Sequence, residues 1–277
     1  MLFLKRFLDF YINSSIHVAL SVYALVRMTG FLFQITIIEA CASFAFFGTI
    51  VGYNFVKYDA LARTQKLQMR TQLKAIALLS FLSLVMAVYC FLWLERITQL
   101  LAILFFGITL LYTLPFFPNR KNARNWAGIK IYIVALCWVG VTLFLPIINA
   151  EIPLTNYVFL VAIQRFILIF VLILIFEIID LKLDDPHLKT VPQQIGVKRT
   201  KIAGSLLMVC FVGFEFFNVN DNINCNFQFS SLLLKLILAI VVLVFLLFSN
   251  EKRTRYYSSF WAESIPILWW VLLLLFQ

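Results

Sequence analysis

Nine apolar runs, most of them about as long as a bilayer is thick, constrain the fold more than any other feature of the sequence. A helix needs about 20 residues to cross a hydrocarbon core of about 30 Å. Phe, Leu, Ile and Val fill the runs without the alternation typical of half-buried strands. Lipid offers no partners for bare backbone groups, so the runs predict spanning helices. The expected spans are residues 14–29, 34–56, 73–93, 97–117, 126–148, 153–179, 201–218, 229–249 and 259–276.

The composition supports an all-α integral membrane protein. Of the 277 residues, 63% are hydrophobic and only 13% are charged, whereas soluble domains carry about 25% charged residues. Nine spans with short loops leave no room for a soluble domain, so we expect a single transmembrane domain over residues 1–277. The net charge is +10. The basic residues lie between the apolar runs, which favours the lipid bilayer or an anionic substrate as partner and argues against nucleic acid.

The basic residues also predict the orientation. The chain has 23 Lys and Arg residues, and all but four of them lie in one alternating set of the segments that flank the spans. The exceptions are Arg27, Arg96, Arg165 and Lys235. Positive residues gather on the cytoplasmic side of membrane proteins. The pattern therefore predicts nine spans with the N-terminus in the cytoplasm and the C-terminus outside.

Three carboxylates lie close together in the sequence at the end of the sixth apolar run. Glu177, Asp180 and Asp184 are spaced i, i+3 and i+7, which would place them within about 60° of one another on a helix. Acidic residues near a membrane are costly and suggest a function. A divalent cation such as Mg²⁺ would relieve their repulsion, since Mg²⁺ binds a few carboxylates, waters and substrate phosphates. A solvated acidic helix end beside basic residues explains the spacing equally well.

The residues after the carboxylates indicate a known family. The pattern E-x-x-D-x-x-x-D over 177–184 precedes the run K-T-V-P-Q-Q-I-G over 189–196. Together they resemble the second aspartate motif of the UbiA-type membrane prenyltransferases, with Glu177 in place of the usual Asp. Residues 112–121 resemble the segment after that family's fourth helix, where a Tyr and a Pro precede a basic pair. Nine helices with a cytoplasmic N-terminus are similar to that family as well.

The resemblance implies a UbiA-like bundle that transfers an isoprenoid from a prenyl diphosphate to a lipophilic, usually aromatic, acceptor. Mg²⁺ would be the cofactor, with Glu177, Asp180 and Asp184 as its ligands and Asp180 and Asp184 as the catalytic residues. The loops at about 57–74 and 180–201 would form the active-site cap. A bacterial inner membrane is the expected location. The implied substrate-binding residues are Asn54, Lys66, Arg70, Arg120, Lys121 and Lys189.

The first aspartate motif of the family, N-x-x-x-D-x-x-x-D, is degenerate in this chain. Asn54 fits it, but Tyr58 and Ala62 occupy the two aspartate positions. Asp59 comes one residue late, about 140° around a helix from Asn54. It would join the metal ligands only if a π-bulge or a helix end turned it inward.

The degenerate motif leaves two alternatives to a working enzyme open. A catalytically altered or inactive homologue would bind an isoprenoid lipid without releasing diphosphate. A small transporter is less compatible, because the chain shows no internal repeat and its acidic residues cluster at one membrane face.

Several single residues have structural explanations. The G-x-x-x-G pair Gly48 and Gly52 favours close helix packing. Arg165 either extends to the interface or pairs with an interior carboxylate or with the acceptor. Glu215 and Glu263 are expected to be interfacial or paired.

Overall fold

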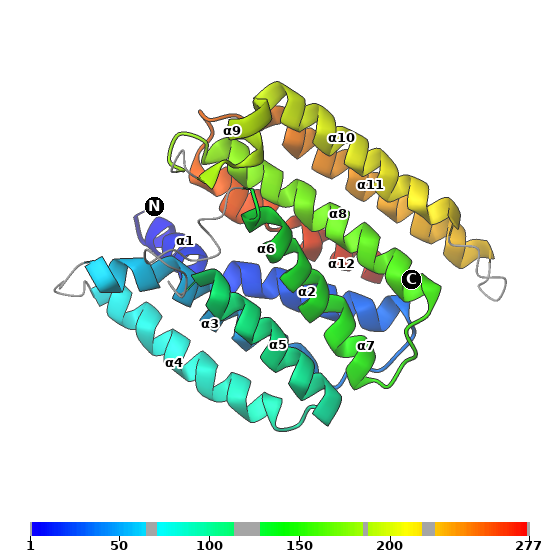
Figure 1. Ribbon diagram of the computed structural model, residues 1–277, viewed down its shortest axis with the longest axis horizontal. Coiled ribbons are helices and arrows are strands. Elements are labelled where there is room, and N and C mark those ends of the chain that lie inside the picture. The colour runs from blue at the N-terminus through cyan, green and yellow to red at the C-terminus, as the bar shows by residue number, and fades with distance from the viewer. Residues whose placement is uncertain (1, 65–70, 114–127, 185–187, 218–224, 276–277) are drawn as a thin grey trace. The chain divides into compact units, whose positions relative to one another are not determined.

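The described part of the chain is helical throughout. The computed structural model describes residues 2–64, 71–113, 128–184, 188–217 and 225–275, and these contain helices and no strand (Figure 1). A helix occupies each of the nine predicted ranges. Within the described residues, six helices are long and apolar enough to cross a membrane, or up to seven if one bent pair counts as one span. The all-helical fold is confirmed, and the count of nine spans stays a prediction.

The chain divides into two compact units. Unit 1 comprises residues 1–122 and 140–152, and unit 2 comprises residues 123–139 and 153–277. One candidate span, Lys130–Asn149, begins in unit 2 and ends in unit 1. The prediction of one transmembrane domain stays a prediction.

Unit 1 is built on a central stack of helices in which α3 packs against both α2 and α4. A π-helical segment, η3, packs against α2, and the Thr29 hydroxyl donates to the Thr142 carbonyl of this segment at 2.7 Å. The helices of unit 1 are α1 (Leu2–Asn13), α2 (Ile16–Leu32), α3 (Glu39–Thr64), α4 (Thr71–Phe91), α5 (Arg96–Thr113), η3 (Gly140–Phe144) and α7 (Leu145–Asn149).

Unit 2 is organised around α8, which contacts α6, α9, α10, α11 and η6. Two thirds of its most apolar window is buried, since Val, Leu and Ile face neighbours on nearly all sides. Figure 1 shows α10 and α11 running side by side. The helices of unit 2 are α6 (Lys130–Val139), α8 (Asn156–Ile179), α9 (Val191–Ile195), α10 (Val197–Gly213), η5 (Phe214–Phe217), α11 (Cys225–Phe248), η6 (Tyr257–Ala262) and α12 (Ile265–Leu275).

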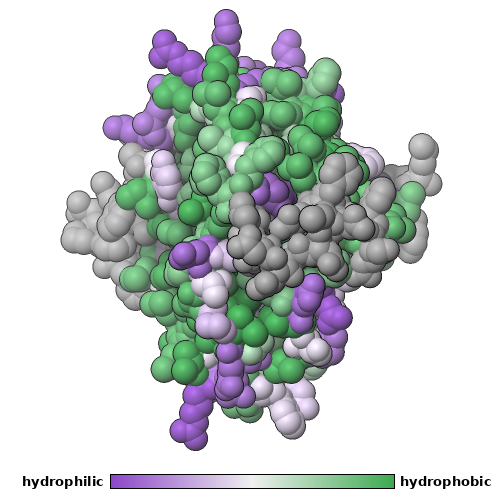
Figure 2. Space-filling view, turned by 90° about the vertical axis from the view of Figure 1, so that its right-hand side faces the viewer, coloured by the Kyte–Doolittle hydropathy of each residue, from purple (hydrophilic) through white to green (hydrophobic). Residues whose placement is uncertain are grey.

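Large apolar side chains cover much of the described surface. Figure 2 shows hydrophobic residues over much of the described part of one face, with hydrophilic residues gathered toward its top and bottom. On α4, Leu78, Phe81 and Val88 are each more than half exposed, and on α5 so are Leu100 and Phe106. Soluble proteins rarely leave such continuous patches uncovered. These helices are therefore in contact with lipid, and the protein is an integral membrane protein.

The glycine pair in α3 differs from its prediction. No described atom lies within 4 Å of a Cβ placed at Gly48 or Gly52. The expected close packing at this G-x-x-x-G is therefore wrong for the described residues. Close packing occurs instead at Gly140 of η3, where a Cβ would lie 1.8 Å from the Phe105 ring.

Candidate functional site

The second acidic motif lies where α8 ends. Glu177 is in the last turn of the helix, with only 2% of its surface exposed. Asp180 caps the helix with φ −84° and ψ 3°. Asp184 follows after one turn, and its N–H donates to the Asp180 carbonyl at 2.9 Å. The three carboxylates therefore do not share one continuous helical face, in contrast to the prediction, because the apolar packing of α8 stops at Ile179 and charged residues follow.

The run after the carboxylates folds into the short helix α9 and returns to the end of α8. The Gln193 side chain accepts a hydrogen bond from the Thr190 N–H at 3.0 Å, which caps the start of α9. Pro192 stands in the first turn, where its missing N–H costs nothing. Glu177 Oε2 accepts the Val191 N–H at 3.0 Å. This hydrogen bond joins the two halves of the predicted motif.

Two basic residues that the sequence did not single out face this acidic motif. Lys130 Nζ, at the start of α6, lies 3.9 Å from Asp184 Oδ2. Burial raises the pKa of Asp180, and the nearby Asp184 raises it further, whereas Lys130 and Arg255 lower it. The only signal for Lys130 in the sequence is a lone cation at the start of an apolar run, and such cations are common at membrane interfaces.

The donor chemistry of Asp180 and Asp184 suits a metal ion, but the three carboxylates of the motif are not gathered into one set of ligands. Within the described residues, no group of three or more His, Cys, Asp or Glu side chains is arranged to hold a metal ion. Asp180 and Asp184 supply hard oxygen donors, and the buried Asp184 Oδ2 accepts no hydrogen bond from the described residues. Mg²⁺ commonly binds one or two carboxylates and completes its octahedron with waters and substrate phosphates. The Glu177 carboxylate is instead engaged with Val191, and its metal role stays a prediction.

The predicted phosphate-binding residues are only partly described. Lys189 is exposed, with φ +45°, immediately before the cap of α9. Its side chain can therefore extend into solvent beside the acidic motif. Lys66, Arg70, Arg120 and Lys121 lie outside the described residues, as does the Asp59 side chain.

The remnant of the first motif holds helices of unit 1 together. The Asn54 amide is 3% exposed and donates to the Ser14 carbonyl at 3.0 Å and to the Ser80 hydroxyl at 2.8 Å. Tyr58, at the first aspartate position, donates its hydroxyl to the Asn13 carbonyl at 2.9 Å. An ionised aspartate has no proton to donate and could not make this bond. Asn54 and Tyr58 therefore both form hydrogen bonds to the junction of α1 and α2.

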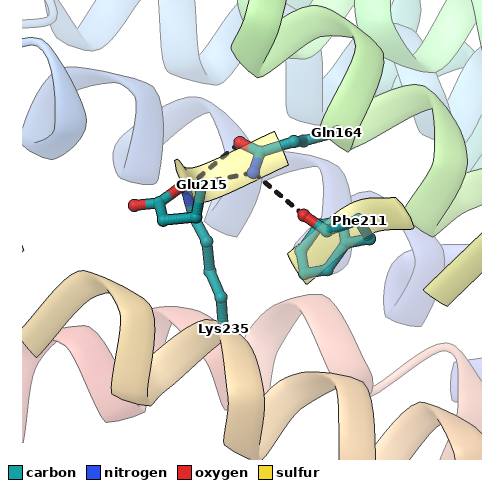
Figure 3. Close-up of polar contacts among 4 residues, drawn as sticks. All are labelled: Gln164, Phe211, Glu215 and Lys235. Atoms are coloured by element: carbon teal, nitrogen blue, oxygen red, sulfur yellow. Dashed lines mark hydrogen bonds and ion pairs between the residues drawn. The ribbon is translucent and has the colours of Figure 1, made fainter. Parts of the chain in front are cut away.

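A second polar cluster is buried in unit 2, remote in sequence from the acidic motif. Lys235 of α11 forms an ion pair with Glu215 of η5 and donates to Gln164 Oε1 of α8 at 3.1 Å (Figure 3). Gln164 Nε2 in turn donates to the Phe211 carbonyl at 3.0 Å. The expectation that Glu215 is paired is confirmed. The neighbouring Arg165 is 1% exposed, so it does not extend to the interface.

The fold and site define a helical membrane protein with an acidic motif at the end of the largely buried helix α8. No family model and no curated protein matches the sequence. Among solved structures, the apo structure of a UbiA homolog from Aeropyrum pernix K1 is similar over 94% of this chain and 98% of that chain. The TM-score is 0.66 and the sequence identity is 14%. The protein therefore has the fold of this UbiA homolog, which confirms the predicted resemblance at the level of the fold.

Proposed function

We propose that the protein is a Mg²⁺-dependent prenyltransferase that moves an isoprenoid from a prenyl diphosphate to a lipophilic, aromatic acceptor. One observation carries the proposal: in a UbiA-type fold, the 177–184 carboxylates and the 189–196 run form one hydrogen-bonded element through Glu177 and Val191. Fold alone does not define chemistry. The donor set at the end of α8 adds the specific support.

Three residues of this element, and Lys130 beside it, have roles in the proposed reaction. Asp180 and Asp184 would hold Mg²⁺, which binds diphosphate oxygens and stabilises the charge of the leaving group. Lys130 neutralises Asp184 in its present position and would also lie near a phosphate bound there. Lys189 is exposed, so its side chain would also be able to contact a phosphate bound there. The bond from the isoprenoid carbon to diphosphate breaks, and the acceptor carbon forms a new bond and loses a proton.

The predicted membrane topology is also part of the proposal. Nine spans with a cytoplasmic N-terminus and an outside C-terminus would put the acidic motif on the cytoplasmic side. A bacterial inner membrane would then provide the bilayer. The loops at 57–74 and 180–201 would cap the site, with Lys66, Arg70, Arg120 and Lys121 as further contacts for the diphosphate.

Binding of a non-cleavable prenyl thiolodiphosphate tests the proposal. The protein in nanodiscs should bind this analogue in Mg²⁺ and not in EDTA. Asp180→Asn and Asp184→Asn should each weaken binding roughly tenfold or more, since even residues that support a metal ligand have effects of that size. Glu251→Gln is the matched control, because this exposed carboxylate pairs only at the surface with Lys182. Unchanged binding in both Asp variants would contradict the proposed site.

The state of the first motif favours a second candidate, a homologue that binds an isoprenoid lipid without catalysis. Asn54 and Tyr58 make hydrogen bonds to Ser14 and Asn13 instead of remaining available for a metal. Such a protein would bind the analogue but release no diphosphate from a cleavable substrate. The two measurements together separate the candidates.

A further inference from the structure

The helix α1 is amphipathic. At about 100° per residue, Lys5, Arg6, Asp9 and Asn13 fall within about 100° of arc, and the apolar residues of α1 other than Leu2 cover the rest. Leu4 is 71% exposed and Phe7 is 61% exposed, and Lys5 and Arg6 are exposed too. A short helix with cations on one face and large apolar residues on the other is typical of the membrane interface.

The geometry of the α1–α2 junction suits the same location. The axis of α1 is bent by 59° from that of α2, across a break at Ser14 and Ser15. The 12 residues of α1 therefore advance only about 9 Å along the axis of α2, given a rise of about 1.5 Å per residue. A helix that advances so little does not by itself cross the hydrocarbon core, and this suits a place at the boundary between headgroups and acyl chains.

Side chains of α3 fix this bend. The Asn54 amide donates a hydrogen bond to the Ser14 carbonyl, and its oxygen accepts one from the Ser15 hydroxyl at 2.8 Å. Lys57 Nζ donates to the Ser15 hydroxyl at 3.0 Å, and Tyr58 binds the Asn13 carbonyl. Ser15 itself has φ +63°, a conformation that non-glycine residues seldom adopt unless their surroundings hold them. These contacts hold the bend in place, and the bend directs α1 away from the axis of α2.

We propose that α1 is an interfacial helix that docks on anionic lipid, with Leu4 and Phe7 at the acyl boundary and Lys5 and Arg6 against the headgroups. The charge of this segment selects an anionic lipid surface over a zwitterionic one. The α3 residues that lock the bend occupy the place of the degenerate first motif. In this chain that end of α3 thus orients a lipid-binding helix.

Proteolysis of the full chain in nanodiscs tests the proposal. The discs contain phosphatidylcholine alone or a mixture with phosphatidylglycerol, and the readout is the rate at which chymotrypsin releases the peptide that ends at Phe7. Each basic side chain near an anionic surface contributes about fivefold in affinity, and Asp9 offsets one of the two. We expect phosphatidylglycerol to slow release about fivefold to 30-fold, and high salt to abolish the difference.

Two double variants complete the test. Lys5→Gln with Arg6→Gln should be cleaved at the same rate in both kinds of disc. Lys198→Gln with Arg199→Gln removes an equivalent exposed pair on α10 and should behave as the unmodified protein does. Equal rates for the unmodified protein in the two discs, whether fast or slow, would overturn the proposal. So would protection by phosphatidylglycerol that survives the loss of Lys5 and Arg6.

Discussion

The Glu177 carboxylate accepts the backbone N–H of Val191 at 3.0 Å and so ties the last turn of α8 to the first residue of α9. Because Glu177 is buried, this bond fixes where the chain after the acidic motif returns. The relationship gives the first residue of the motif a positioning role that an amide could also fill.

Substitution of Glu177 separates this positioning role from metal binding. Glu177→Gln keeps an acceptor for Val191 and should leave thermal stability nearly unchanged. Glu177→Ala leaves the partly buried Val191 N–H without its acceptor and should cost about 1 kcal/mol or more, measured as a lower unfolding temperature in nanodiscs. If Glu177 instead binds Mg²⁺, the Gln variant will lose Mg²⁺-dependent stabilisation while remaining folded, which would contradict the positioning role.

The raised pKa of Asp180 predicts a pH dependence with a definite sign. Burial and Asp184 raise this pKa above its ordinary value of 3.8, so the folded protein binds the proton more tightly than the unfolded chain does. Stability without metal should therefore fall as pH rises from that ordinary value through the raised pKa. Mg²⁺ requires the ionised carboxylate, so Mg²⁺ affinity should rise over the same window. Unfolding curves in EDTA and in Mg²⁺ measure both trends, and Asp180→Asn should abolish them.

Lys130 should shift that pH window. Its positive charge lowers the pKa of Asp180, so Lys130→Gln should move the midpoint of Mg²⁺ binding to higher pH. Lys182→Gln is the control, because Lys182 is largely exposed and pairs with Glu251. The same midpoint in the Lys130 variant and the unmodified protein would show that Lys130 does not act on the site.

The buried pair of Lys235 and Glu215 should behave as one unit. Removal of one partner leaves a charge uncompensated, and such changes cost about 3–5 kcal/mol in buried pairs. Lys235→Met and Glu215→Gln should each lower the unfolding temperature strongly, and the double variant should recover part of the loss. A double-mutant cycle measures the coupling. Additive losses would show that the two side chains do not stabilise each other.

Tyr58 tests whether the first motif now serves the α1–α2 bend. Tyr58→Phe removes one hydrogen bond and should cost about 1 kcal/mol. Tyr58→Asp restores the aspartate of the family pattern but places an acceptor against the Asn13 carbonyl, so it should cost more. Unfolding temperatures and Mg²⁺ titrations check both variants. Tighter Mg²⁺ binding by Tyr58→Asp would show that the position remains a metal site.

The helices could be predicted from the sequence because lipid leaves an apolar run only one regular structure apart from a barrel. The sixth run was expected at 153–179, and α8 spans Asn156–Ile179. The end of the run at residue 179 therefore agrees with the end of α8. The sequence did not predict that helical geometry stops before Asp184, because the i, i+3, i+7 spacing assumes a continuous helix. The separate helix α1 could not be predicted either, because the bend between α1 and α2 depends on Asn54 and Tyr58, about 40 residues away in sequence.

The residues of the acidic motif could be predicted from the sequence, but their arrangement in space could not. The spacing of Glu177, Asp180 and Asp184 indicates this segment, and its charge is evident without the Lys, Thr and Pro of the family pattern. The approach of Lys130 to Asp184 could not be inferred, because it depends on how α6 packs against α8. Long-range packing of this kind leaves no periodic signal in a single sequence.

The most direct test of the central claim is diphosphate release by the purified protein in nanodiscs, followed with radiolabelled prenyl diphosphate and an aromatic acceptor. Release should require Mg²⁺, and Asp180→Asn and Asp184→Asn should abolish it, while Glu251→Gln should retain it. Full release by both Asp variants, or release that is insensitive to EDTA, would contradict the assignment of a Mg²⁺-dependent prenyltransferase.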